Sequence, residues 1–378
     1  MDEAKRVLIL SVKAGAGHMR AAAALEEVLR EEHPGVEVKN TETLELTSLA
    51  FRKSFTGAYE KLVTHLPSVW KLIYEKMEAK PVTSKSKRLA TLFDRANARR
   101  ILKAVDEFAP DRVVCTHYFP AEILAPRRRK GKLAAPLFVT LTDYDIHVMW
   151  IQDGVDHYFV ASDEMAWALR AKGIGNARVS VTGIPIMPVF SREYPGRATM
   201  RARLGLRPDA PTALVSAGGF GLSSIDQVVS TLADSMDDVQ FLAVAGRNEK
   251  LRKGLEEVAA TRRGRIVPFG FVDNMHELMA ASDLAVTKSG GLTSSECLAM
   301  GLPMVIVSPI PGQEERNADY LLENGAAVRA NSPAHLVFKV KRLLGDEARL
   351  ARMRAAARHI ARARAVYDIV ETVLRPLP

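Results

Sequence analysis

Short apolar runs alternate with helical patterns along this chain, and several of these runs end in a glycine-containing turn. Residues 6–12 form the first run, the turn 14–17 follows, and helical spacing begins after His18. Strands that alternate with helices predict a parallel, doubly wound sheet with functional sites at the carboxyl ends of its strands. The expected strands are residues 6–12, 36–38, 112–116, 137–141, 158–161, 179–181, 213–217, 241–245, 265–269, 284–287, 304–307 and 326–328.

The chain has 378 residues, about twice the usual size of one domain, so we expect two domains that share a cleft. Residues 182–188 (TGIPIMP) contain two prolines and a glycine and are the expected linker. The predicted fold class is α/β, with two Rossmann-like parallel-sheet domains that face the cleft. We expect one domain at residues 1–187, the other at 188–360, and a C-terminal helix at 361–378 that packs back toward the first domain.

The charge balance favours an anionic partner, because 53 Lys and Arg against 44 Asp and Glu give a formal net charge of +9. Cys115 and Cys297 are isolated in apolar runs, which argues against a disulfide scaffold or a cysteine metal site. No apolar run reaches the length of a membrane span, and no nucleic-acid motif is present in the sequence. We expect a cytoplasmic protein whose membrane contact is peripheral.

Aromatic and basic residues are interleaved in residues 51–80, where Tyr59, Trp70 and Tyr74 stand out. Such a segment suits a lipid interface, but a helical hairpin that covers the sheet explains the same spacing equally well. The basic run 127–132 (RRRKGK) is expected to be a solvated loop, which adds modest support for an anionic membrane surface.

The stretch 286–317 combines a strand end, a glycine turn, a helix start and a polar cluster. Gly290 and Gly291, with Lys288 beside them, suit a phosphate, although a tight turn between strand and helix is the plainer explanation. Residues 293–296 (TSSE) read as a capping box or, alternatively, place Glu296 on the ribose hydroxyls of a nucleotide. Residues 313–315 (QEE) follow the next strand and suit sugar hydroxyls.

His18 directly follows the first glycine turn, at a strand end where a ligand is expected. A histidine in this position can take a proton from an attacking hydroxyl near neutral pH, although a lone histidine is as often structural. Asp143 and Asp145 could hold a divalent metal, but other ligands are lacking nearby in the sequence. We interpret Asp143 as an acceptor contact or a partner of the base, and we expect no metal and no cofactor.

Several motifs together resemble the family of monogalactosyldiacylglycerol synthases and processive diacylglycerol glucosyltransferases. The motifs are Lys13-x-Gly15-x-Gly17-His18, Thr142-Asp143 with His147 and Trp150, Gly183-Ile184-Pro185, Gly218-Gly219, Lys288-x-Gly290-Gly291-x-Thr293-x-x-Glu296 and Pro311-Gly312-Gln313-Glu314. They occur in the family's order over nearly the whole chain. Ser289 departs from the pattern, because relatives often have proline after that lysine.

The resemblance implies a GT-B fold and inverting, metal-independent transfer of glucose or galactose from UDP-glucose or UDP-galactose to diacylglycerol. It implies that Gly219 contacts the diphosphate, Glu296 the ribose, Gln313 and Glu314 the hexose, and His18 the acceptor hydroxyl. The full expected donor-binding set is Gly218, Gly219, Phe271, Lys288, Gly290, Gly291, Thr293, Glu296, Gln313, Glu314 and Asn317. The expected acceptor or membrane set is Gly17, Tyr59, Trp70, Tyr74, His147 and Trp150.

The expected product is a β-glycolipid made at the inner face of the cell membrane, in a reaction that requires the two domains to close. A UDP-sugar epimerase is an alternative enzyme class for such a fold. A basic scaffold that senses UDP-sugar and binds membranes without catalysis is a second alternative.

Overall fold

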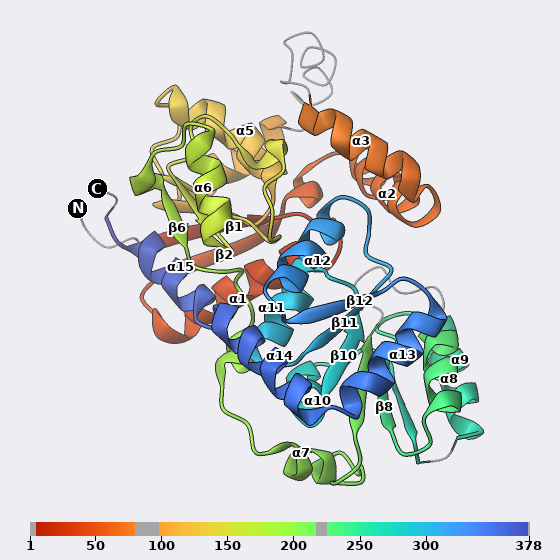
Figure 1. Cartoon of the computed structure of the whole chain (residues 1–378). Helices are drawn as coiled ribbons and strands as arrows, with labels where there is room; N and C mark the ends of the chain where they lie inside the picture. Colours follow the sequence, from red (N-terminus) through yellow and green to blue (C-terminus); the bar gives the residue numbers. More distant parts are fainter. Residues whose placement is uncertain (1–4, 80–97, 217–224, 263, 377–378) are drawn as a thin grey trace. The chain divides into compact units, whose positions relative to one another are not determined.

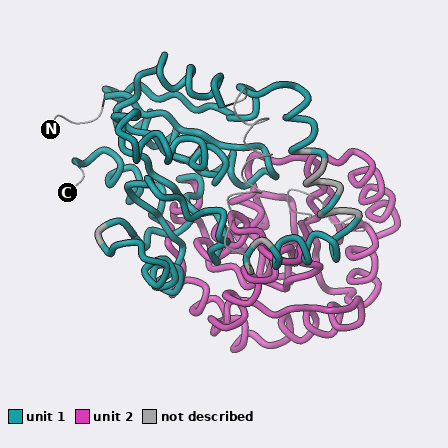
Figure 2. Tube along the Cα trace, turned by 90° about the horizontal axis from the view of Figure 1, so that it is seen from above, with its two compact units in different colours: residues 1–188, 364–378 teal, residues 189–363 magenta. Residues whose placement is uncertain are grey.

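The structure is a computed structural model of the chain and describes residues 5–79, 98–216, 225–262 and 264–376. The chain divides into two compact units (Figure 2). Unit 1 contains residues 1–188 and 364–378, and unit 2 contains residues 189–363. The last helix of the chain therefore belongs to the same unit as the first strand.

Unit 1 is built on a six-stranded, all-parallel sheet with the strand order β2-β1-β3-β4-β5-β6 (Figure 1). The strands are β1 (Arg6–Ser11), β2 (Glu37–Glu42), β3 (Arg112–Cys115), β4 (Leu137–Thr140), β5 (His157–Val160) and β6 (Val179–Val181). The helices are α1 (Gly17–Glu32), α2 (Leu49–His65), α3 (Pro67–Ala79), residues 98–108, α5 (Tyr118–Arg129), α6 (Asp163–Ala171) and α15 (Ala365–Leu374).

The core of unit 1 joins the two ends of the chain. Val7 and Ile9 of β1 pack with Leu25 of α1 and with Ile369 and Val370 of α15, all of them buried. Arg112 reinforces this contact, since its Nε donates a 3.0 Å hydrogen bond to the main-chain oxygen of Val373. Helix α15 is apolar on most of its surface, so it covers the sheet of unit 1 as an integral part of that core.

Unit 2 is built on a second six-stranded parallel sheet, with the order β12-β11-β10-β7-β8-β9. The strands are β7 (Thr212–Ser216), β8 (Gln240–Val244), β9 (Ile266–Phe269), β10 (Leu284–Thr287), β11 (Met304–Val307) and β12 (Ala327–Ala330). The helices are α7 (Arg197–Arg203), α8 (Ile225–Ser235), α9 (Glu249–Ala260), α10 (Met275–Ala281), α11 (Gly291–Ala299), α12 (Gln313–Glu323), α13 (Pro333–Leu344) and α14 (Glu347–Ile360). This order is that of a dinucleotide-binding fold, in which the strand order reverses between β7 and β10 and ligands bind beyond that point.

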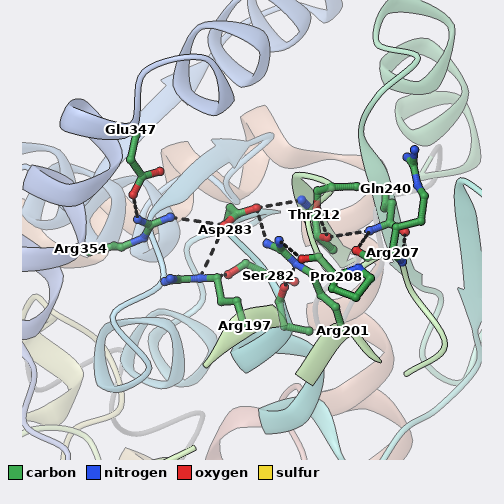
Figure 3. A network of polar contacts seen from close by, with 12 residues as sticks. Arg197, Arg201, Arg207, Pro208, Thr212, Gln240, Ser282, Asp283, Glu347 and Arg354 are labelled. Atoms are coloured by element: carbon green, nitrogen blue, oxygen red, sulfur yellow. Dashed lines mark hydrogen bonds and ion pairs between the residues drawn. The ribbon is translucent and has the colours of Figure 1, made fainter. Parts of the chain in front are cut away.

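A buried ion cluster fixes the amino end of β10 (Figure 3). Asp283 accepts a 2.6 Å contact from Arg201 and a 2.9 Å hydrogen bond from the main-chain N–H of Thr212. Its second oxygen lies 3.4 Å from Arg354 of α14 and 3.6 Å from Arg197. One carboxylate therefore ties α7, β7 and α14 to the end of β10 that lies opposite the glycine turn.

The predicted α/β class with two parallel sheets is confirmed, and every expected strand overlaps an observed one. The prediction of a solvated loop at residues 127–132 is wrong for its first half, because α5 continues to Arg129 through Pro126. Its arginines pair with aspartates: Arg127 with Asp106, Arg128 with Asp156 and Arg129 with Asp153, at 3.2, 2.7 and 2.6 Å. These contacts neutralise much of the run locally, which weakens its contribution to a membrane-binding surface.

Candidate functional site

In unit 1, His18 is the second residue of α1 and follows the turn that leaves β1. Gly15 in this turn has φ of 83°, a backbone conformation that favours glycine. The expected acceptor contact Gly17 is the first residue of α1, and no side chain caps the helix start. Because β3 lies beside β1, the residues after β3 come close to His18.

Two hydrogen-bond partners hold the His18 ring. Its Nδ1 lies 2.8 Å from the main-chain oxygen of Thr116 and 2.9 Å from Oγ1 of Thr142. A carbonyl oxygen can only accept, so Nδ1 carries the proton in the neutral ring and Nε2 keeps its lone pair. Thr116 also donates its hydroxyl to the main-chain oxygen of His18, at 3.0 Å. The arrangement presents Nε2 as a proton acceptor.

Burial lowers the pKa of His18 to about 4, while the hydrogen bond to Thr116 opposes this shift. The start of α1 acts in the same direction as burial, because a helix N-terminus disfavours positive charge. His18 is therefore neutral at physiological pH, which is the form that a general base requires.

The other expected acceptor residues gather along the loop after β4 and on α3. Trp150 is buried with its ring centroid 6.1 Å from that of His18. His147 lies 4.3 Å, ring to ring, from the buried Tyr74 and approaches its main-chain oxygen at 3.3 Å. Asp143 directly follows Thr142 and is partly exposed, and among the described residues the hydrogen bonds of His18 go to threonines.

Residues 51–79 fold into the helices α2 and α3, which pack against each other as a hairpin (Figure 1). Phe51 and Phe55 pack against Phe119: the Phe51 ring stacks on it with centroids 5.6 Å apart, and the Phe55 ring is tilted at 5.4 Å. Trp70 is partly buried against Tyr74, and the Tyr59 side chain lies outside the described residues. Among the described side chains of residues 51–79, the exposed large apolar ones are aliphatic, and the aromatic pattern of the sequence did not predict them: Leu66, Val69 and Leu72. None of the helices within the described ranges is long and apolar enough to cross a membrane.

In unit 2, the adjacent strands β7 and β10 end at the point where the strand order reverses. Oγ of Ser216, the last residue of β7, donates a 3.0 Å hydrogen bond to Oγ1 of Thr287, the last residue of β10. Gly218 and Gly219 follow Ser216 but lie outside the described residues. The partly buried Lys288 follows Thr287.

Helix α11 begins at Gly291 with Gly290 as its N-cap residue, and no side chain caps it. The predicted capping box at residues 293–296 is wrong, because the extended backbone of Gly290 allows the helix to start two residues earlier. The amide groups of the first turn are therefore not occupied by a cap and can receive an anion. Thr293 is partly exposed in this turn, while Glu296 is buried further along the helix.

Polar residues at the start of α12 lie against this turn. Oγ of Ser289 donates a 2.6 Å hydrogen bond to the main-chain oxygen of Glu314, and the buried Asn317 donates to the main-chain oxygen of Ser289 at 3.0 Å. The Glu314 carboxylate accepts from the main-chain N–H of Ile310 and reaches Gly290, where an added Cβ would lie 3.6 Å from it. Gln313 is the first residue of α12. The predicted donor residues around the turn are thus brought together.

Phe271 lies just beyond the carboxyl end of β9, and its side chain is half exposed. The guanidinium of Arg247, which follows β8, lies 4.5 Å from the centre of the Phe271 ring. Sequence reasoning missed Arg247, although its place in a glycine-containing turn after a strand was a usable signal. No cluster of three or more His, Cys, Asp or Glu side chains suited to a metal ion occurs in the parts of the chain that the structure describes.

Comparisons with known proteins match both halves of the chain. Residues 18–186 match the monogalactosyldiacylglycerol synthase family, and residues 213–373 match the C-terminal domain of glycosyltransferase family 28. The processive diacylglycerol β-glucosyltransferase of Bacillus subtilis is 30% identical over 99% of this chain and 96% of its own.

Solved structures share the fold at much lower identity. MurG of Acinetobacter baumannii is 16% identical, with a TM-score of 0.66 over 98% of this chain and 99% of its own. The UDP-GlcNAc 2-epimerase of Neisseria meningitidis, bound to UDP-GlcNAc, is 14% identical, with a TM-score of 0.62 over 98% and 100%. Since a transferase and an epimerase share this fold, the fold alone does not choose between these reactions.

The two parallel sheets, the uncapped glycine turn and the family matches define a glycosyltransferase of the GT-B type. The chain belongs to the family of monogalactosyldiacylglycerol synthases and processive diacylglycerol β-glucosyltransferases, as its sequence motifs indicate.

Proposed function

We propose that this protein transfers a hexose, glucose or galactose, from its UDP-sugar to diacylglycerol and forms a β-glycolipid. The observation that carries the proposal is the His18 ring, whose Nδ1 is held by the Thr116 carbonyl so that Nε2 accepts a proton. The similarity to a diacylglycerol β-glucosyltransferase over nearly the full chain supports the acceptor class. At this identity glucose and galactose both stay open, because they differ at one hydroxyl.

Unit 2 supplies the groups for the donor in this proposal. The amides at the start of α11, the predicted Gly218 and Gly219, and Lys288 receive the diphosphate, whose negative charge grows as it leaves. Glu296 binds the ribose, and Gln313 with Glu314 binds the hexose. The exposed Phe271 ring and the Arg247 guanidinium offer a flat surface for the nucleobase.

Unit 1 supplies the base. The acceptor hydroxyl gives its proton to Nε2 of His18 while its oxygen forms a bond to the sugar C1. The bond from C1 to the diphosphate oxygen breaks, and its electron pair leaves with UDP. Attack from the face opposite the leaving group inverts the configuration at C1, which yields the β-linkage. We propose that no metal takes part, since amides and a lysine meet the charge.

We further propose that the reaction takes place at the inner face of the cell membrane. Leu66, directly before α3, and Val69 and Leu72 on α3 would enter the lipid interface, with nearby Lys71 and Lys76 facing anionic headgroups. The buried Tyr74 connects this helix to His147, so the lipid-contacting helix is anchored next to the loop that carries Thr142.

The test is a transfer assay with purified protein, diacylglycerol vesicles containing anionic lipid, and either UDP-glucose or UDP-galactose. We expect release of UDP and a hexosyl-diacylglycerol with a β-linkage, detected by mass spectrometry and NMR, and the same rate in EDTA. Transfer of neither hexose would refute the lipid assignment. Conversion of the sugar nucleotide without acceptor would instead identify an epimerase.

A further inference from the structure

A second histidine, His117, lies against His18 in unit 1. It follows β3, and the two imidazole rings meet edge to face, with centroids 4.6 Å apart and planes at 87°. The contact arises because β1 and β3 are parallel neighbours, so that the residues after both strands meet. His117 is 3% exposed, so its imidazole is buried against His18.

The two rings hold their protons on opposite nitrogens. Nδ1 of His117 accepts a 3.1 Å hydrogen bond from the main-chain N–H of Phe119 and so caps α5. A backbone N–H can only donate, so the neutral His117 ring carries its proton on Nε2. In His18 the proton is on Nδ1, because its partner is a carbonyl oxygen. His117 is therefore anchored by α5 in one orientation, independently of His18.

His117 has no lone pair available to act as a base itself, because its Nδ1 accepts from the Phe119 N–H and its Nε2 carries the proton. Burial and the neighbouring His18 both lower its pKa well below the ordinary value. Tyr118 lies 4.2 Å away and Trp150 6.0 Å away, ring to ring, and Phe55 closes a further side at 6.4 Å. The titratable groups around the pair are Tyr118, whose pKa is raised by burial and Glu122, and Asp143 beside Thr142.

We propose that His117 is a positioning residue for His18: its fixed ring sets the plane of the His18 imidazole and excludes water from one face. This role rests on the proposed function of His18 as the base. It predicts that the orientation of the His18 ring depends on packing against the His117 ring and not on the His117 proton. A ring of similar shape without nitrogens should therefore replace it for this purpose.

Two variants distinguish the packing of the His117 ring against His18 from the capping of α5 by His117. In His117→Asn the side-chain oxygen can still cap α5, but the ring is lost and water reaches His18. We expect the turnover number to fall about 10- to 100-fold with little change in the KM for UDP-sugar. The acid limb of kcat/KM should move upward from about pH 4 toward the ordinary histidine range. His117→Phe loses the cap of α5 and should unfold at a lower temperature. Its ring still packs against His18, so the acid limb of kcat/KM should stay near the wild-type pH.

An NMR titration of isotope-labelled histidine tests the same idea without turnover. In the wild type the His18 signals should report the Nδ1–H tautomer and a pKa near 4, whereas in His117→Asn the pKa should rise. An unchanged His18 pKa and acid limb in His117→Asn would overturn the positioning role. If the wild type transferred no hexose, the proposed function would fail, and the titration would still decide whether His117 sets the state of His18.

Discussion

Ser216 and Thr287 join their hydroxyl groups across the ends of β7 and β10, at 3.0 Å. Both hydroxyl groups are buried, and each belongs to the last residue of its strand. In an open parallel sheet this is the place where a nucleotide diphosphate binds. The donor groups of the proposed reaction are therefore arranged around one point in unit 2, and the first prediction concerns them.

Replacement of Glu296 by Gln should weaken UDP binding about 10- to 100-fold, because a hydrogen bond to a charged group contributes about 1.5–3 kcal/mol. The carboxylate is buried on α11, one turn beyond the amides that would receive the diphosphate. Calorimetric titration with UDP measures the effect. Glu257→Gln on the exposed surface of α9 is the control and should bind UDP as the wild type does. Equal affinity of both variants for UDP would show that Glu296 does not bind the ribose.

Replacement of His18 by Ala should lower the turnover number by about 10²- to 10⁴-fold, the usual contribution of a general base. UDP affinity should stay unchanged, since the donor groups are in unit 2. The control is His33→Ala at the other end of α1, which should keep both activity and fold. Turnover of His18→Ala at the wild-type rate, measured by UDP release, would show that another group takes the proton.

The free energy of unfolding should fall as the pH is lowered from about 6.5 toward 4. The pKa values of His18, His117 and His157 are lowered in the folded chain, chiefly by burial. The unfolded chain then binds more protons in this range, so acid favours unfolding by up to about 1.4 kcal/mol per pH unit for each histidine. Urea titrations at several pH values measure the slope. His157→Phe, beside Phe138 and Phe159, should reduce it, and an unchanged slope would contradict this account.

The strands could be predicted from the sequence because continuous β-branched runs suit only buried parallel strands. His18 was predicted for a related reason, since a glycine turn at a strand end is typical of a ligand site, and its role stays a prediction. Contacts that depend on strand order were not predictable. The Arg128–Asp156 pair and the His18–His117 contact join residues 28 and 99 positions apart, and only the sheet brings them together. The start of α11 was misplaced because the hydroxyl-rich residues 293–295 resembled an N-cap, whereas the helix starts two residues earlier, after the extended Gly290, and has no side-chain cap.

Replacement of Asp283 by Ala should destabilise unit 2 by about 3–5 kcal/mol, because it leaves buried arginines without their carboxylate. The side chains of Arg201 and Arg354 are only 7% and 10% exposed (Figure 3). The matched control is Asp237→Ala, which removes a 97% exposed partner of Arg265 and should cost about 0–1 kcal/mol. Chemical denaturation measures both. If Asp283→Ala lowered the free energy of unfolding by less than about 1 kcal/mol, the prediction would be wrong, and the arginines would be solvated in the variant.

Replacement of Leu66, Val69 and Leu72 together by Glu should abolish vesicle binding while leaving the fold and UDP affinity intact. These side chains, on α3 and on the residue directly before it, are 52%, 44% and 52% exposed, and their transfer into lipid should contribute roughly 1 kcal/mol each, or about 100-fold in affinity together. Introduced carboxylates would also repel anionic headgroups. Co-sedimentation with vesicles of anionic lipid measures binding. Phe338→Glu on α13 is the control, because Phe338 is 59% exposed but lies in unit 2. If the triple variant still bound vesicles as strongly as this control, α3 would not be the lipid contact.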